Sequence, residues 1–401
     1  MKSIKIIFCA VILLFININA QKSTYTILVS FDGFRWDYVN RGITPTLQKV
    51  IKEGVHALSL RPTFPSKTFP NHLSIVTGLH ASHHGIISNS IYDPVYKEKY
   101  KLSNKDAVTE ARWYQGEAFW ETAERQGIKT ASYFWPGSEV TLDYRRPSYY
   151  KEYEHDKKYE ERIDGVIDWL KLPIEERPRF ITLYFDLTDT YGHDFGPNSE
   201  ETNWAISRLD SMANYLIEKI NETSIKDSVN VIFVSDHGMT EVSEDRIINV
   251  KNLIKDYECR ISDIGPFMTI EPKKNDIDKI YNIIKKKENH FKIYKKGEIP
   301  DYYFFNDHHL VSSLLLVADI GWSLTTRDNL GKYTTKGNHG YEKDHTDMHG
   351  IFIAKGPGFK NNYKTGTLWN IDIYSLLCKI YNIYPRTNID GRLERIGFIL
   401  K

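Results

Sequence analysis

The chain has 401 residues, of which 41% are hydrophobic, 13% aromatic and 26% charged. This composition is that of an ordinary globular protein, and it excludes a disordered, collagen-like or coiled-coil chain. The 53 Lys and Arg side chains balance the 52 Asp and Glu side chains. A protein that scaffolds nucleic acid or binds anionic membrane surfaces is therefore disfavoured.

The first twenty residues have the pattern of a secretory signal peptide. Lys2 and Lys5 precede the apolar run Ile6–Phe15, and a polar segment leads to the small residue Ala20. The run is too short to cross a bilayer, which needs about twenty apolar residues. We therefore expect residues 1–20 to be removed, and residues 21–401 to form one secreted domain, extracellular or periplasmic, without a transmembrane segment. An amphipathic or strand-forming N-terminus is the alternative.

Three apolar runs, Tyr25–Phe31, Phe180–Phe185 and Val229–Ser235, predict strands. Each is too apolar for an exposed strand and suits a parallel sheet that is covered on both faces. Helical patterns lie among them, at Pro45–Glu53, Pro70–Thr77, Gly116–Gln126, Glu160–Leu170 and Glu201–Ile220. This alternation predicts an α/β fold with a mostly parallel central sheet and helices on both faces.

The region at about 251–335 departs from this alternation. The strand-like segment Pro266–Ile270 is followed by a Lys-rich helical segment, Asn275–Lys287, and then by a second strand-like segment, Leu310–Val317. We interpret the region as a small α+β insertion within the main domain.

Acidic residues and histidines follow each predicted strand. Asp32 ends the first strand, and Asp236 and His237 end the third. Asp189 and His193 follow the second strand, in a segment that its glycines predict to be a loop. Because ligands bind at the carboxyl ends of strands in open α/β sheets, these side chains should meet at one edge. Carboxylates and imidazoles are typical zinc ligands, and five of them exceed the needs of one catalytic ion, so the pattern predicts two ions.

A further histidine ligand is expected from elsewhere in the chain. His339, in the glycine-rich stretch Gly337–Gly340, is the best candidate. His345 and His349 are a rival pair because they would lie one helical turn apart, although no third ligand is near them in the sequence. Structural or solvent-facing histidines are the alternative for this pair.

Thr68 is the candidate nucleophile. The helical run that follows it places Thr68 at or beside a helix N-terminus, where free backbone amides and the helix dipole favour an anion. A simple helix cap is the alternative interpretation. Next to two metal ions, which can turn a hydroxyl into an alkoxide, the nucleophile is the stronger interpretation.

An ordered set of motifs runs from about Tyr25 to Gly391. Its members are Val29–Gly33, Thr63–Asn71, Val76–Leu79, His84–Asn89, Tyr92–Pro94, Phe134–Ser138, Asp189–His193, Ser235–Met239 and Asn338–Tyr341. In this order they resemble the nucleotide pyrophosphatase/phosphodiesterase family of the alkaline phosphatase superfamily. The resemblance implies an alkaline-phosphatase-like fold and a hydrolase that releases nucleoside 5′-monophosphates from nucleotides.

The resemblance also implies two zinc ions per chain and assigns their ligands. One ion would be held by Asp189, His193 and His339, and the other by Asp32, Asp236, His237 and the Thr68 oxygen. Asn89 and the backbone amide of Phe69 would bind the phosphoryl oxygens. Thr68 would attack in line to form a covalent phospho-threonine, which a zinc-activated water would hydrolyse.

Two further positions concern the substrate. Phe69 and Tyr150 match places where a base would be stacked, and Gln115 stands where nucleotide-cleaving relatives often carry Lys. An aromatic cage for choline is the alternative use of such rings, as in a glycerophosphocholine- or lysophospholipid-type phosphodiesterase. A phosphomonoesterase and a catalytically inactive secreted binding protein also stay open. Sequence-specific nucleic-acid binding is not expected.

The cysteines and one sequon leave open questions. Cys259 and Cys378 remain after removal of the signal peptide, and they could pair or stay free. Asn221 begins an Asn-x-Thr sequon whose glycosylation the sequence does not decide.

Overall fold

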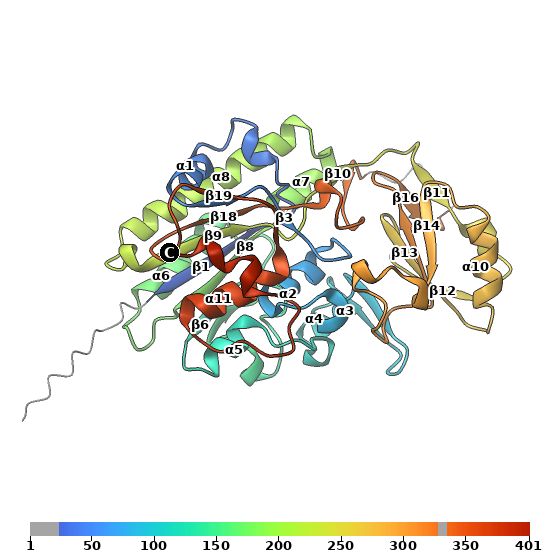
Figure 1. The fold of residues 1–401 in the computed structure, drawn as a ribbon, viewed down its shortest axis with the longest axis horizontal. Coiled ribbons are helices and arrows are strands. Elements are labelled where there is room, and N and C mark those ends of the chain that lie inside the picture. The colour runs from blue at the N-terminus through green and yellow to red at the C-terminus, as the bar shows by residue number, and fades with distance from the viewer. Residues whose placement is uncertain (1–23, 328–334) are drawn as a thin grey trace, which may run out of the picture.

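The computed structural model describes residues 24–327 and 335–401, so the expected signal peptide lies outside the described residues. An eight-stranded sheet in the order β19-β2-β18-β9-β1-β8-β6-β7 forms the centre of the main body (Figure 1). In that order the strands span Tyr363–Thr365, Val55–Ala57, Phe352–Lys355, Val229–Val234, Tyr25–Phe31, Phe180–Phe185, Thr130–Tyr133 and Tyr149–Lys151. Strand β18 is antiparallel to both of its neighbours, and the other pairings are parallel. The mostly parallel sheet expected from the sequence is confirmed.

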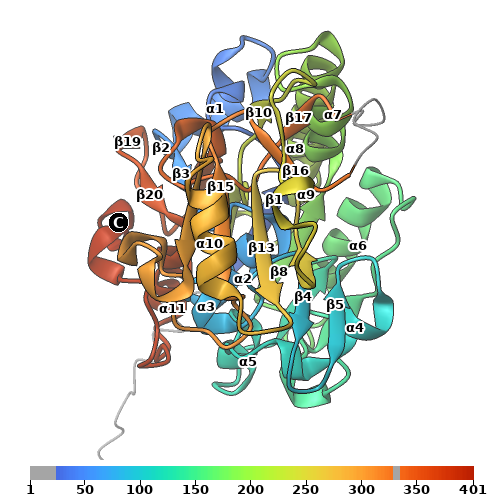
Figure 2. The same ribbon diagram turned by 90° about the vertical axis from the view of Figure 1, so that its right-hand side faces the viewer.

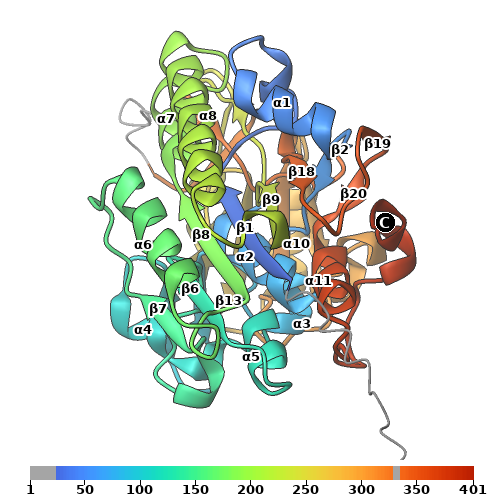
Figure 3. The same cartoon turned by 90° about the vertical axis from the view of Figure 1, so that its left-hand side faces the viewer.

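Helices cover one face of this sheet with a layer formed by α1 (Pro45–Glu53), α6 (Tyr159–Lys171) and α8 (Glu200–Asn221) (Figure 3). Their apolar side chains pack against alternate residues of β1, among them Ile27 and Val29. The bounds of these helices agree with the sequence-based expectation to within a residue at each end.

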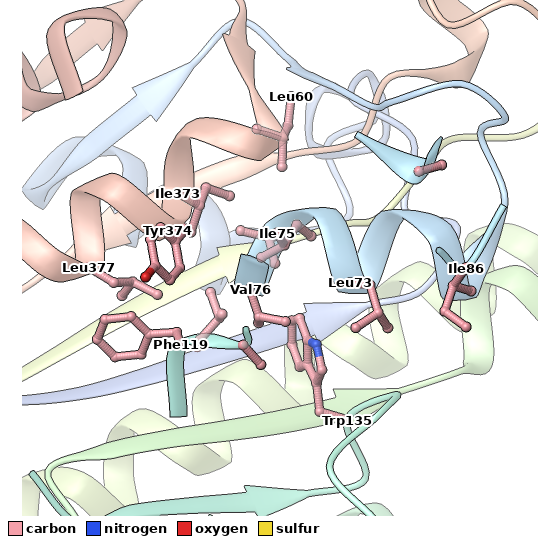
Figure 4. Close-up of a cluster of buried hydrophobic side chains, with 14 of the residues drawn as sticks. Leu60, Leu73, Ile75, Val76, Ile86, Phe119, Trp135, Ile373, Tyr374 and Leu377 are labelled. Carbon is pink, nitrogen blue, oxygen red and sulfur yellow. The ribbon is translucent and has the colours of Figure 1, made fainter. Parts of the chain in front are cut away.

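The opposite face is covered by α2 (Thr68–Thr77), α5 (Phe119–Glu124) and α11 (Ile373–Tyr381). Figure 4 shows Ile75 and Val76 of α2 beside the side chains of α11 and α5. Every residue of β1 is buried, because helices cover both sides of it, which explains its continuous apolar sequence.

The insertion forms its own antiparallel sheet, in the order β12-β13-β15-β14 (Figures 1 and 2). In that order the strands span Cys259–Ser262, Phe267–Pro272, Leu314–Ala318 and Phe291–Lys295. Helix α10 (Ile277–Lys285) covers one face of this sheet through Ile280 and Ile284. Cys259 lies in β12 and Cys378 is buried in α11, and both are free thiols.

Short elements complete the described part of the chain. They are the helices α3 (Ala81–His84), α4 (Lys105–Thr109) and α9 (Lys251–Ile254), and the strand pairs β3 (Leu60–Arg61) with β20 (Leu368–Trp369), β4 (Ser90–Asp93) with β5 (Glu98–Lys101), β10 (Thr240–Glu241) with β17 (Gly337–Asn338), and β11 (Ile247–Asn249) with β16 (Ser323–Thr325). Among the residues described, no helix is long and apolar enough to cross a membrane.

One expectation is wrong: the segment that carries Asp189 and His193 is a helix, α7 (Leu187–Phe195), and not a loop. Its glycines do not break it where the sequence suggested. Gly192 lies within the helix, at a place where an added Cβ would come within 3.0 Å of Met239 Cε, and the chain leaves the helix only at Gly196, whose φ is +90°. The helix places Asp189 and His193 four residues apart on one face.

Asp210 of α8 supplies the cap that α1 lacks. The N-cap residue Thr44 makes no side-chain cap. Instead, the amides of Thr46 and Leu47 donate to the Asp210 carboxylate at 3.0 and 2.8 Å. A buried carboxylate thus satisfies the free amides of a neighbouring helix and joins α8 to α1.

Replacing Asp210 with alanine should therefore lower the free energy of unfolding by about 1–3 kcal/mol, because two buried amides lose their acceptor. Urea unfolding followed by circular dichroism measures the change. Asp168→Ala, at an exposed position of α6, is the matched control and should change stability by less than about 0.5 kcal/mol. Equal stability of the two variants would contradict the capping role.

Candidate active site

Three adjacent strands deliver the candidate ligands to one edge of the sheet. Strand β1 lies between β9 and β8. Asp32 follows β1, Asp236 follows β9, and α7 follows β8. As expected, these side chains meet at the carboxyl ends of the strands.

The first cluster consists of Asp32, Asp236 and His237, which are all buried. His237 Nε2 lies 3.0 Å from Asp236 Oδ2 and 3.3 Å from Asp32 Oδ1. The Thr68 hydroxyl oxygen lies 3.3 Å from the same nitrogen. Thr68 is the first residue of α2, directly after the N-cap residue Lys67.

The second cluster consists of Asp189, His193 and His339. Asp189 Oδ1 lies 3.5 Å from the Nε2 atoms of both histidines, which are themselves 3.1 Å apart. The two clusters are neighbours, because Asp189 Oδ1 is also 4.0 Å from His237 Nε2. Together they contain all six Asp and His side chains that the sequence analysis had proposed as ligands.

The protonation of the three imidazoles follows from their outer contacts. His193 Nδ1 donates to the Gly337 carbonyl, His339 Nδ1 to the Ser66 carbonyl and His237 Nδ1 to the Gly238 carbonyl, at 2.8–2.9 Å. A carbonyl only accepts, so Nδ1 carries the proton in each ring. In the neutral form of such a ring, Nε2 carries the lone pair and faces the centre of the site, which is the tautomer that a metal ligand requires.

The carboxylates fit the same interpretation. Asp32 Oδ1, Asp189 Oδ1 and Asp236 Oδ2 are buried and have no hydrogen-bond partner among the described residues. Burial raises the pKa of Asp32 well above its ordinary value, and the charges of Asp236 and Asp189 raise it further. Burying carboxylate oxygens without hydrogen-bond partners costs free energy, and cations placed between the carboxylates would offset this cost. The residues present therefore fit two metal ions.

Two side chains outside the clusters hold ligands in place. The Tyr184 hydroxyl donates to Asp32 Oδ2 at 2.6 Å. His72, beneath Thr68, lies between the Ser30 hydroxyl at 2.8 Å and the Thr68 carbonyl at 2.9 Å. The sequence analysis did not identify Tyr184, because an aromatic residue within a strand run resembles any other core residue.

A cavity of about 560 Å³ opens in front of Thr68. Its deep side carries the acidic and histidine side chains, and its outer side is lined mainly by Phe69, Leu102, Val108 and Tyr153. Lys105 and Glu139 add charges at the rim, where Lys105 pairs with Glu152 at 2.7 Å. The cavity thus combines a floor of candidate metal-ligand side chains with an apolar slot.

Asn89 and Phe69 lie beside Thr68, as expected. The Phe69 amide donates to the Asn89 side-chain oxygen at 3.1 Å. In this arrangement the Phe69 N–H is already used, and the Asn89 amide group is the donor that remains for a phosphoryl oxygen.

Tyr150 and Gln115 are not among the residues that line this cavity. The Tyr150 hydroxyl accepts from Arg146 at 3.1 Å, and the Gln115 side-chain oxygen lies 3.1 Å from His308 Nε2. Tyr153, three residues after Tyr150, occupies the slot. The family resemblance had suggested Tyr150 for this position, and the structure corrects it to Tyr153, because Tyr150 lies in the edge strand β7 and Tyr153 lies beyond the end of that strand.

The rival histidine pair has structural contacts. His349 is buried and lies 2.9 Å from the Ser59 hydroxyl and 3.2 Å from the Lys343 carbonyl. His345 Nδ1 accepts from the Asp347 amide at 3.3 Å. Neither belongs to the two metal-ligand clusters found in residues 24–327 and 335–401.

Comparisons with known proteins agree with this geometry. The sequence profile of the type I phosphodiesterase/nucleotide pyrophosphatase family matches residues 26–342. The chain is 36% identical over 389 residues to ectonucleotide pyrophosphatase/phosphodiesterase family member 1 of Homo sapiens, covering 94% of this chain but 42% of that protein. It is 34% identical over 375 residues to bis(5′-adenosyl)-triphosphatase enpp4 of Xenopus laevis, covering 93% and 81% of the two chains.

Solved structures give the same result. Murine ectonucleotide pyrophosphatase/phosphodiesterase 5, an inactive threonine-to-alanine variant in complex with AMP, superposes with a TM-score of 0.89 at 31% identity, covering 94% of this chain and all of that one. The human counterpart superposes equally well at 32% identity. The alkaline-phosphatase-like α/β fold is thereby confirmed. The chain belongs to the type I phosphodiesterase/nucleotide pyrophosphatase family.

Proposed function

We propose that this chain is a secreted two-zinc phosphodiesterase/nucleotide pyrophosphatase, which releases nucleoside 5′-monophosphates through a covalent phospho-threonine. The observation that carries the proposal is the position of the Thr68 hydroxyl, at the start of α2 and 3.3 Å from His237 of the first of two adjoining clusters. The relatives support nucleotides as substrates, since one is named a bis(5′-adenosyl)-triphosphatase and another was solved with AMP.

The two clusters are the proposed zinc sites. Asp32, Asp236 and His237 would hold one ion together with the Thr68 oxygen, and Asp189, His193 and His339 would hold the other. When bound, zinc supplies positive charge that neutralises the carboxylates and favours the ionised form of the Thr68 hydroxyl.

The chain's own groups account for the two chemical steps. Thr68 Oγ1 releases its proton to solvent water and attacks phosphorus, so that the Oγ1–P bond forms while the bond between phosphorus and the leaving oxygen breaks and the leaving oxygen keeps the electron pair. Water then cleaves the Oγ1–P bond and the threonine hydroxyl is restored. The Asn89 amide donates to a phosphoryl oxygen, and Phe69 and Tyr153 flank the slot that would take the base.

Replacing Thr68 with alanine should reduce turnover by about a thousandfold or more while the protein stays folded and keeps its metal, because the nucleophilic oxygen is lost. Thr68→Ser is the matched control, and it should retain measurable activity because it keeps a hydroxyl. Hydrolysis of a p-nitrophenyl nucleotide ester, measured with the metal content, provides the test. Near wild-type activity in the alanine variant would show that Thr68 is not the nucleophile.

Removing a ligand should lower bound metal and activity together. We expect Asp32→Ala, His193→Ala and His339→Ala each to fall below the roughly two equivalents of zinc per chain of the wild type, since an incomplete ligand set binds an ion weakly. His345→Ala, outside both clusters, should keep the wild-type metal content. Elemental analysis decides, and full occupancy in all three ligand variants would refute the assignment.

The ester class follows from charge. A monoester carries two negative charges and a diester one, and Asn89 beside Thr68 is a neutral donor. Diesters should therefore have the higher kcat/KM, by about tenfold or more, because the site is matched to one phosphate charge. Comparing p-nitrophenyl phosphate with methyl p-nitrophenyl phosphate, and with the p-nitrophenyl ester of thymidine 5′-monophosphate as the nucleotide case, tests this, and a preference for the monoester over the methyl diester would indicate a phosphatase. Glycerophosphocholine, assayed beside them, tests the choline-type alternative.

A further inference from the structure

A second cavity of about 750 Å³ adjoins the catalytic cavity. It lies among residues 155–160 at the start of α6 and the neighbouring parts of α7 and α8. The two cavities share three lining residues, His155, Asp186 and Thr190. Thr190 directly follows the proposed zinc ligand Asp189, so the two cavities meet beside the proposed zinc site.

An exposed aromatic platform lies in this second cavity. Trp204 of α8 is 54% exposed, which is unusual for so large an apolar ring. Tyr191 of α7 supports it, with ring centroids 5.2 Å apart and planes inclined by 31°. Figure 3 shows α7 and α8 side by side on one face of the molecule, next to α6. The indole therefore has one supported side and an accessible surface on which a flat ring can stack.

The charges of the second cavity select the kind of ligand. Its lining contains three cationic and three anionic side chains, which are Lys157, Lys158, Arg208, Asp156, Glu160 and Asp186. Arg208 pairs with Glu160, and Asp186 with Arg162. This balance does not favour a chain of phosphates, whereas the stacking surface suits an uncharged aromatic group. The phosphates would stay at the cationic metal sites of the first cavity.

We propose that the second cavity binds the nucleoside of the leaving group, so that dinucleoside polyphosphates are bound at both ends. This inference rests on the proposed function. One base lies between Phe69 and Tyr153, the reacting phosphate lies at Thr68, and the second base stacks on Trp204. The bond from phosphorus to the leaving oxygen breaks as before, and the departing nucleoside phosphate carries the second base.

Diadenosine triphosphate and ATP form a matched substrate pair, because they differ only in the second adenosine. Trp204→Ala should raise KM for diadenosine triphosphate by about tenfold, the effect of losing one stacked base, and should leave KM for ATP within about twofold. Trp204→Phe keeps an aromatic ring, and its KM for diadenosine triphosphate should stay close to that of the wild type. Tyr144→Ala removes another exposed ring, 78% accessible and outside both cavities, and should change neither KM. Thermal melting checks that every variant is folded.

The possible outcomes distinguish a failure of the subsite inference from a failure of the proposed function. If the wild type hydrolyses ATP and the thymidine ester, and Trp204→Ala changes both KM values equally or neither, the subsite is refuted while the proposed function stands. If the folded, zinc-loaded wild type hydrolyses none of the substrates, the proposed function is refuted and the inference with it. A selective rise in KM for diadenosine triphosphate, reversed by phenylalanine, is the expected result.

Discussion

The mutual repulsion of buried ligand groups is the constraint on which the site depends. Three carboxylates and three imidazole lone pairs converge at the ends of β9, β1 and β8, and three of the carboxylate oxygens have no hydrogen-bond partner in the described residues. Burial lowers the pKa of His339 well below its ordinary value, and nearby His237 lowers it further. Such a cluster does not form by its own attraction, so the surrounding fold must hold it together.

Backbone carbonyls and buried side chains provide that restraint. The Ser66 carbonyl accepts from His339 and thus links the segment before the nucleophile to the segment after β17. Gly340 lets the two segments approach, because a Cβ there would lie 2.5 Å from Lys67 Cε and its φ is +114°. Tyr184 fixes Asp32 from β8, the strand beside it. The six candidate ligands, Thr68 and the supporting residues therefore form one unit, and the apolar cores on the two faces of the sheet keep it rigid.

The site is also placed for an extended substrate. The apolar slot at Phe69 and Tyr153 opens beside Thr68, and the shared residues His155, Asp186 and Thr190 connect this cavity to the platform at Trp204. Arg162 keeps this second region ordered. It is fully buried and donates to the Tyr184 and His155 carbonyls at 3.0 Å, so the strand end and the segment at residue 155 are tied to α6. Helix α7 contributes to both parts, with Asp189 and His193 in the clusters and Thr190 between the two cavities.

The amino-acid sequence by itself determined the three central strands β9, β1 and β8, most of the covering helices and the six metal-ligand candidates. Continuous apolar runs are visible as buried parallel strands, and topology brings the carboxyl ends of such strands together, so Asp32, Asp189 and Asp236 could be placed at one edge. The expectation that Asn89 and Phe69 bind phosphate came from the family resemblance. Only the tertiary structure decided that α7 is a helix, that Tyr153 and not Tyr150 lines the slot, that Cys259 and Cys378 are free, and that Trp204 faces an adjoining cavity. The reason is physical: local patterns specify which faces are buried, whereas the direction of a side chain beyond the end of a strand, and the space in front of it, depend on contacts between distant segments.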